Sequence, residues 1–307
     1  RAGASGVERS VCLLVEDAEV KDILHIWNWI MIAGLIAVFF SPLSGALIRG
    51  FSLVPVMRAL YGLYSLSMLI KCLISLRYTT ETRQGRIRRA QTKGESILRM
   101  AFGYWRLLPK VIRDEGTLRV LAVMVVLNIT VMVNQNFYSL YATAGLGIPE
   151  NYLAYFPIIR AMIMLLFFFV IQHRLEKFRT KAPMKLGLAL YMLCQAIMIF
   201  SPPGRPVVLV FYTLFEAVAF GIVLPRKELM SAVFVNKQER ARIIALLTTM
   251  TIAIAMPFGA ITGLLSKLDG RLPFVLSFSL FLFLFAVIST MKKDPDPPLQ
   301  NEAAQES

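Results

Sequence analysis

The chain has 307 residues, of which 57% are hydrophobic and only 17% are charged. Soluble globular domains carry about 25% charged residues, so the composition argues against that class. The net charge of +14 does not indicate nucleic-acid binding, because the cations lie between hydrophobic runs and not on one basic face. We therefore predict an all-α polytopic membrane protein, since lipid accepts only helices or closed barrels and the sequence lacks the period-two alternation of strands.

Eight apolar runs are long enough to cross a ~30 Å hydrocarbon layer as helices. Five of the runs contain no charged residue, and the other three contain one or two each. The predicted spans are residues 26–48, 50–76, 120–149, 151–173, 186–204, 206–225, 243–266 and 272–291.

Lysine and arginine are distributed unequally between the two sides that these spans define. With eight crossings both termini lie on one side, and the segments on that side hold 26 of the 33 cations, against 5 in the opposite turns. Because cytoplasmic loops carry the excess of cations, we expect both termini in the cytoplasm. The protein is then an integral, multi-pass protein of a plasma or inner membrane, in contact with lipid.

A long polar interval divides the spans into a group of two and a group of six. We expect residues 1–76 to hold the first two spans and residues 119–293 to form a six-helix unit. Between them, 77–118 reads as a basic cytoplasmic loop, and 294–307 reads as a disordered polar tail. Within the loop, 97–112 has apolar residues at helical spacing, so it either lies on the anionic leaflet or packs against helix ends.

The sequence offers no metal site and no cofactor motif. Its three cysteines lack CxxC spacing, and its two histidines are far apart. A GxxxxGK[ST] loop is also missing, which argues against ATP hydrolysis within this chain. We therefore predict neither a metal nor a cofactor.

Two stretches near opposite ends of the chain are similar to each other. In each, a charged turn precedes a helix with an internal Pro near small residues, and a second Pro begins the next helix. The matching pairs are Val15 with Val235, Glu19 with Glu239, Pro42 with Pro257, and Pro55 with Pro273. A weak internal repeat of this length is typical of transporters built from two similar halves.

The repeat and the division into two and six spans resemble the major facilitator superfamily of secondary transporters. The eight spans then resemble the fifth to twelfth helices of a twelve-helix protein, so we expect an N-terminally truncated chain. The resemblance implies a helical bundle that moves a small solute by alternating access, most often coupled to protons.

A Pro-containing motif in the first span extends this resemblance. Many family members, especially antiporters, carry G-x3-GP-x2-GG in the fifth helix, and here the corresponding positions are Ala37, Ser41, Pro42 and Gly45. The motif favours antiport or efflux of drug-like or organic solutes, although a Pro beside small residues also occurs in other packed membrane helices.

Two further sets of residues have counterparts in the family. Pro257 and Gly259 occupy the equivalent part of the second repeat, so we include them in the predicted conformational motif. Glu239, Arg240 and Arg242 match by type the carboxylate and arginine that pair at a cytoplasmic helix end, so they are candidates for a cytoplasmic gate.

Two charged residues lie inside predicted spans near the middle of the membrane. Arg160 and Glu216 are nine and ten residues from the outer starts of their spans, or ~14–15 Å deep. Charges at that depth are costly and generally face a partner or a cavity. The residues either form an ion pair that only joins two helices, or serve as an anion clamp (Arg160) and a protonatable coupling acid (Glu216).

The span at 120–149 carries four amides within nine residues. Asn128 and Gln135 are seven residues apart and share one face, whereas Asn134 and Tyr138 lie on an adjoining face. So many polar side chains are unusual on a lipid-facing helix. The span either lines a polar cavity or hydrogen-bonds to neighbouring helices without touching a ligand.

These features together predict a proton-coupled secondary transporter of a small-molecule substrate. Two other classes stay open. One is a non-transporting receptor or scaffold of the same fold. The other is a polytopic membrane enzyme, which would need polar catalytic groups clustered at one interface, and the sequence does not show such a cluster.

Overall fold

The structure is a computed structural model, which describes residues 20–38, 47, 50–78, 108–153, 155–175, 178–234 and 240–291. Every regular element within these ranges is helical, which confirms the predicted all-α class. The elements are α2 (Val20–Val38), α4 (Leu53–Tyr78), α7 (Leu108–Arg113), α8 (Glu115–Leu140), η1 (Tyr141–Gly145), α9 (Glu150–Leu153), α10 (Phe156–Phe167), η2 (Phe168–Gln172), α11 (His173–Leu175), α12 (Lys181–Ile199), α13 (Val207–Phe234), α14 (Arg240–Leu268) and α15 (Leu272–Ser289).

Six helices of the described chain are long and apolar enough to cross a membrane, namely α4, α8 with η1, α12, α13, α14 and α15. The helix formed by α10 and η2 is apolar but shorter, and α2 is not among the six. The protein is therefore a multi-pass integral membrane protein. That α2 and α10 also cross, which would make eight spans, stays a prediction.

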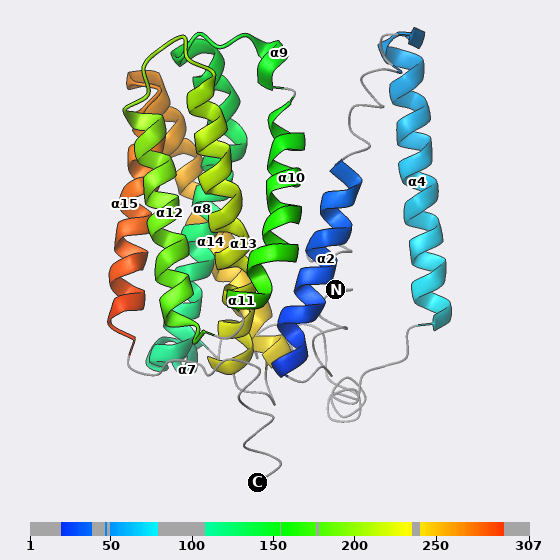
Figure 1. Ribbon diagram of the computed structural model, residues 1–307. Helices are drawn as coiled ribbons and strands as arrows, with labels where there is room; N and C mark the ends of the chain where they lie inside the picture. Colours follow the sequence, from blue (N-terminus) through cyan, green and yellow to red (C-terminus); the bar gives the residue numbers. More distant parts are fainter. Residues whose placement is uncertain are drawn as a thin grey trace.

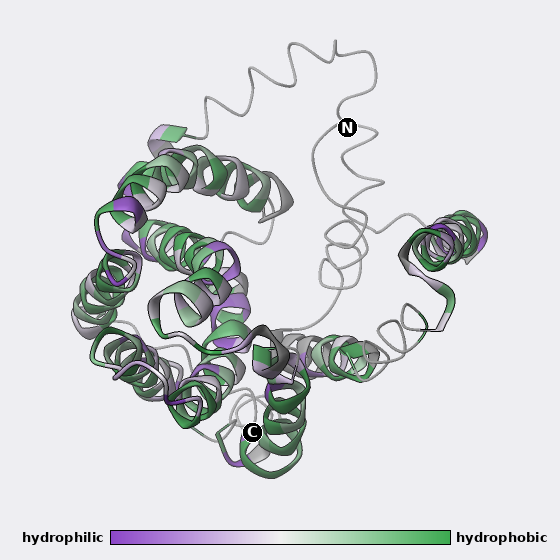
Figure 2. Ribbon diagram, turned by 90° about the horizontal axis from the view of Figure 1, so that it is seen from above, coloured by the Kyte–Doolittle hydropathy of each residue, from purple (hydrophilic) through white to green (hydrophobic). Residues whose placement is uncertain are grey.

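The helices α8, α10 and α12–α15 stand side by side as one bundle (Figure 1). Within it α12 packs against α13 and α15, while α8 packs against α13, α14 and α15. The helix α2 lies against α10 and α13. By contrast, α4 stands apart from the bundle in both views (Figures 1 and 2), and no residue of its most apolar stretch is buried.

Hydrogen bonds between the turns show that successive bundle helices alternate in direction. At one end, Gly204 N–H donates to Leu146 O at 2.7 Å, and Arg271 Nε donates to the Tyr141 hydroxyl at 3.2 Å. At the other end, Lys181 Nζ donates to Met291 O at 2.8 Å, which holds the start of α12 beside the end of α15. Three turns thus meet at the end that carries α9 (Figure 1). Which end is cytoplasmic stays a prediction.

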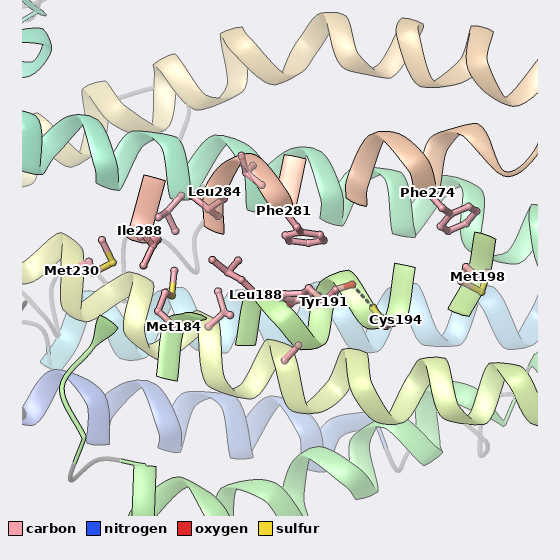
Figure 3. Close-up of a cluster of buried hydrophobic side chains, with 14 of the residues drawn as sticks. Met184, Leu188, Tyr191, Cys194, Met198, Met230, Phe274, Phe281, Leu284 and Ile288 are labelled. Atoms are coloured by element: carbon pink, nitrogen blue, oxygen red, sulfur yellow. Dashed lines mark hydrogen bonds between the residues drawn. The ribbon is translucent and has the colours of Figure 1, made fainter. Parts of the chain in front are cut away.

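The centre of the bundle is an apolar layer between α12 and its neighbours (Figure 3). Tyr191 of α12 stacks on Phe281 of α15, with ring centroids 4.6 Å apart and planes 5° from parallel. Both rings are buried. Many large apolar side chains on the helices are exposed, and apolar residues predominate along the ribbon (Figure 2), as expected where lipid rather than water surrounds a bundle.

Two glycines allow α13 to approach its neighbours closely. A Cβ at Gly187 of α12 would lie 2.5 Å from a methyl carbon of Val223, and a Cβ at Gly221 would lie 2.7 Å from the Phe167 ring of α10. Small residues are common at helix contacts in membrane proteins. Because the hydrophobic effect does not drive helices together in lipid, close van der Waals packing must stabilise their association.

Several predicted features lie outside the described residues. They are Ser41, Pro42 and Gly45, Glu239, the tail 294–307 and most of the basic loop 77–118. Ala37 belongs to α2, and Arg240 and Arg242 begin α14, but only their backbone is described. The conformational role of Ala37, Ser41, Pro42 and Gly45 stays a prediction. The gate role of Glu239, Arg240 and Arg242 also stays a prediction.

Candidate functional site

Arg160 of α10 and Glu216 of α13 form a two-pronged ion pair across adjacent helices. Arg160 Nε donates to Oε2 of Glu216 at 2.6 Å, and Nη2 donates to Oε1 at 3.1 Å. Parallel hydrogen bonds of this kind are the strongest arrangement that an arginine and a carboxylate can make. The pair is unequal in exposure, since 34% of the Arg160 side chain is exposed and only 10% of the Glu216 side chain.

The pair lies well inside the bundle along the helix direction. Glu216 is nine residues beyond Val207, the first residue of α13, which corresponds to ~14 Å of helix at 1.5 Å per residue. The hydrocarbon layer is about 30 Å thick, so a position of this depth is near its middle.

Aromatic rings surround the pair on three helices. The Phe220 ring of α13 lies under the guanidinium, with Arg160 Cζ 4.8 Å from its centroid. Tyr138 of α8 stacks on Tyr212 of α13 at 5.2 Å and meets Phe156 of α10 edge-on at 6.5 Å. Tyr212 lies one helical turn before Glu216, and Phe156 lies one turn before Arg160. We call these rings and the ion pair together the Arg160–Glu216 cluster.

Polar contacts connect α8 to the same cluster. The Tyr212 hydroxyl donates to Oδ1 of Asn134. The Tyr138 hydroxyl is buried beside the Thr213 side chain of α13. Its position makes it a candidate contact for a water or a ligand.

The predicted polar side chains of α8 lie in two different environments. Asn134 and Tyr138 are half-buried and belong to the cluster, whereas Asn128 and Gln135 are exposed on the other face that the sequence predicted. Exposed amides at this depth are consistent with either of the interpretations made from the sequence. Substrate contact by Asn128 or Gln135 stays a prediction.

Sequence reasoning overlooked Tyr212 and Phe220. These residues lie four positions before and four positions after Glu216, so all three occupy one face of α13. An aromatic residue on each side of a buried charge, at helical spacing, was the signal that could have found them.

A second buried polar group lies farther along α13, at the end of the bundle near α11. Arg226 is 2% exposed and donates to Leu175 O at 2.8 Å and to Ile222 O at 3.2 Å. Nearby on η2, Gln172 Nε2 donates to Asn28 of α2 at 3.5 Å. The predicted span ended at residue 225, directly before Arg226, so this buried arginine was not anticipated.

The Pro257 region of α14 is a continuous helix and faces outward. Pro257 and Gly259 are both exposed. The nearest atom to a Cβ at Gly259 would be Met132 Sδ of α8, at 3.8 Å. Both residues therefore lie on the outer surface of the bundle. Their predicted role in conformational change stays a prediction.

No group of three or more His, Cys, Asp or Glu side chains that could hold a metal occurs in the described part of the chain. The chemistry available at the cluster is therefore that of an ion pair, aromatic faces, an amide and hydroxyls. Such groups can bind a small molecule through charge, hydrogen bonds and ring contacts.

A comparison with models of protein families matches residues 28–277 to the MFS_1 like family. The chain belongs to this family. Its members are part of the major facilitator superfamily, in agreement with the resemblance seen in the sequence, and membership points to a transporter. A comparison with curated proteins found no match. In an MFS_1 like protein, the Arg160–Glu216 cluster is the strongest candidate for the site of transport.

Proposed function

We propose that this MFS_1 like protein is a secondary active transporter that moves a small organic solute by alternating access, with protons as the coupling ion. The observation that carries the proposal is the Arg160–Glu216 ion pair between α10 and α13. A charge pair at mid-membrane depth is costly to maintain, and such residues typically serve ion or substrate pathways.

Protons are the favoured coupling ion because of the kind of acid that the pair contains. Among the described residues, Glu216 is the acidic side chain placed in the middle of an apolar spanning helix. A carboxylate can gain and lose a proton, and its partner Arg160 stays protonated at all physiological pH values.

Antiport and efflux are narrower expectations that rest on the Pro42 motif. Ser41, Pro42 and Gly45 of that motif lie outside the described residues, so the fold adds no support to either. A receptor or scaffold of the same fold is the alternative function. It would need neither mid-membrane charges nor proton exchange.

The experiment is a transport assay on the full-length protein reconstituted in liposomes that contain a pH-sensitive dye. A panel of anionic, neutral and cationic organic solutes is added outside, and both solute uptake and internal pH are recorded. We expect at least one solute to move protons and to exchange with its own labelled form across the membrane. A receptor or scaffold would move neither solute nor protons, and that result would refute the proposed function.

A further inference from the structure

The hydrogen-bond geometry of the ion pair leaves the arginine, and not the carboxylate, available to a ligand. Both oxygens of Glu216 accept from Arg160. A guanidinium has five N–H groups, and the pair uses one on Nε and one on Nη2. The two on Nη1 and the other on Nη2 have no acceptor among the described residues.

The exposed fractions of the two side chains lead to the same conclusion, that the arginine is the accessible member of the pair. About a third of the Arg160 side chain is exposed, compared with a tenth of the Glu216 side chain. An arriving molecule therefore meets the Arg160 side chain before it meets the carboxylate. Because an arginine exposed to hydrocarbon at this depth is costly, its exposed edge is expected to face a polar space.

The neighbouring rings provide apolar contact beside those N–H groups. Phe220 lies against the guanidinium, and Tyr138 joins the cluster through Tyr212 and Phe156. Phe220 and Tyr138 are half-buried, so part of each ring stays accessible. A small carboxylate with an aromatic or other planar body matches this combination of groups.

We propose that the Arg160–Glu216 cluster binds an organic anion together with a proton. The anion carboxylate accepts from the free N–H groups of Arg160, which places a second negative charge beside Glu216. Two carboxylates on one guanidinium favour the uptake of a proton by one of them. The proton comes from bulk water and is held by the Glu216 carboxyl group. Binding of the anion and of the proton therefore reinforce each other.

Other titratable groups face Glu216 but do not compete for this proton. They are Arg160 from α10, Tyr138 from α8, Tyr191 and Cys194 from α12, and Tyr212 from α13. Phenols, thiols and guanidinium groups all keep their protons between pH 5.5 and 7.5 in ordinary surroundings. In the proposed complex, the Glu216 carboxyl group is the one that shares its arginine with the incoming carboxylate.

The inference rests on the proposed function and names its substrate class and the sign of its coupling. An anion and a proton that bind together would travel in the same direction. The antiport expected from the Pro42 motif would instead require the proton and the solute to exclude each other.

The test measures binding of benzoate to the full-length protein by calorimetry between pH 5.5 and 7.5, with proton uptake measured in a weakly buffered solution. Benzamide and benzylammonium serve as neutral and cationic matches of the same shape. We expect benzoate to bind most tightly, with an affinity that falls by up to tenfold per pH unit as one proton becomes harder to supply. We expect E216Q to keep benzoate binding, to lose the proton uptake and to lose the pH dependence.

Arginine variants test the anion contact itself. R160K keeps the charge but loses the paired N–H groups, and we expect it to weaken benzoate binding at least tenfold. Because R160Q alone would leave Glu216 buried without a partner, the double variant R160Q/E216Q removes both charges, and we expect it to fold and to lose benzoate binding. The matched control is R119Q, which removes an arginine from the Arg119–Glu115 pair of the same bundle.

Three results would overturn the inference: benzamide or benzylammonium binding as tightly as benzoate, pH-independent benzoate binding to the unaltered protein, or benzoate binding that survives in R160Q/E216Q. Proton-coupled transport of a neutral or cationic solute, without benzoate binding, would overturn the anion inference and leave the proposed function standing. Failure of every solute to cross the membrane would refute the proposed function instead.

Discussion

Tyr212 donates its hydroxyl hydrogen to the side-chain oxygen of Asn134, which joins α13 to α8 beside the Arg160–Glu216 pair. Tyr212 is buried, so its hydroxyl has no alternative contact with bulk water. The bond connects the helix that carries Glu216 to the helix that carries the amides. It therefore ties two parts of the candidate site into one unit.

Removing this contact should destabilise the bundle. Asn134→Leu leaves the Tyr212 hydroxyl without its acceptor, and we expect a loss of about 1–2 kcal/mol in the free energy of unfolding. The measurement is denaturant unfolding of the purified protein in detergent. In a double-mutant cycle with Tyr212→Phe, the two substitutions should not be additive, because both remove the same bond. Additive losses would show that the hydroxyl and the amide act independently.

Glycine at position 221 should be required for close packing of α13 on α10. In Gly221→Ala, the new methyl group would lie 2.7 Å from the buried Phe167 ring, and we expect a loss of about 1–3 kcal/mol in unfolding free energy. Gly263→Ala is the control, because no atom lies within 4 Å of a Cβ there. That substitution should be neutral or stabilise by up to about 1 kcal/mol through helix propensity. Equal effects at both sites would contradict the packing model.

Gln195 of α12 should be replaceable by an apolar residue. Its side chain is buried, its Oε1 has no hydrogen bond to a described residue, and its Nε2 reaches only Cys194 Sγ at 3.9 Å. Gln195→Met removes the unsatisfied oxygen at similar volume, so we expect unchanged or higher stability in thermal unfolding. Transport should also be unchanged. A marked loss of transport with normal stability would assign Gln195 a ligand contact instead.

The membrane orientation can be tested with single cysteines in a variant that lacks Cys12, Cys72 and Cys194. Arg205 and Phe178 are exposed in turns at opposite ends of the bundle. In intact cells, we expect a membrane-impermeant maleimide to label Arg205→Cys at once and Phe178→Cys only after permeabilisation. The reverse pattern would contradict the orientation that the cation distribution predicts.

The sequence was informative where charge or hydropathy changes abruptly. Arg160 and Glu216 stood out because they interrupt apolar spans, and their similar depth followed from counting residues. The span predicted at 272–291 agrees with α15 at Leu272–Ser289. Here Pro273 is the second residue of the helix, and the run that follows contains no charged residue.

The sequence was less informative where charged residues lie in the first turns of a helix. The span predicted at 186–204 begins five residues too late, since α12 starts at Lys181. Two lysines were read as part of the preceding loop. In the fold, Lys181 Nζ donates to the backbone carbonyl of Met291, which lies just after α15. Lys185 Nζ lies 5.1 Å from the centroid of the Phe285 ring. Contacts of this kind join helices that are far apart in the sequence, so a hydropathy pattern does not indicate them.

The same limit applies to the candidate site. The stack of Tyr138 on Tyr212 and the bond from Tyr212 to Asn134 join residues more than seventy positions apart. Helical periodicity fixes which side chains share a face, but it does not fix which face meets which neighbour. Only the packing of α8 against α13 brings these groups together.

The most direct test of a coupling role for Glu216 compares solute-driven proton movement and solute exchange in the same liposomes. The variant is Glu216→Gln, and the matched control is Glu115→Gln, which removes an exposed carboxylate from the ion pair at the start of α8. We predict that Glu216→Gln lowers proton movement to the level of empty liposomes while labelled solute still exchanges, and that Glu115→Gln leaves both unchanged. Undiminished proton movement in Glu216→Gln would contradict the assignment of Glu216 as the coupling acid and leave the Arg160–Glu216 pair a purely structural contact.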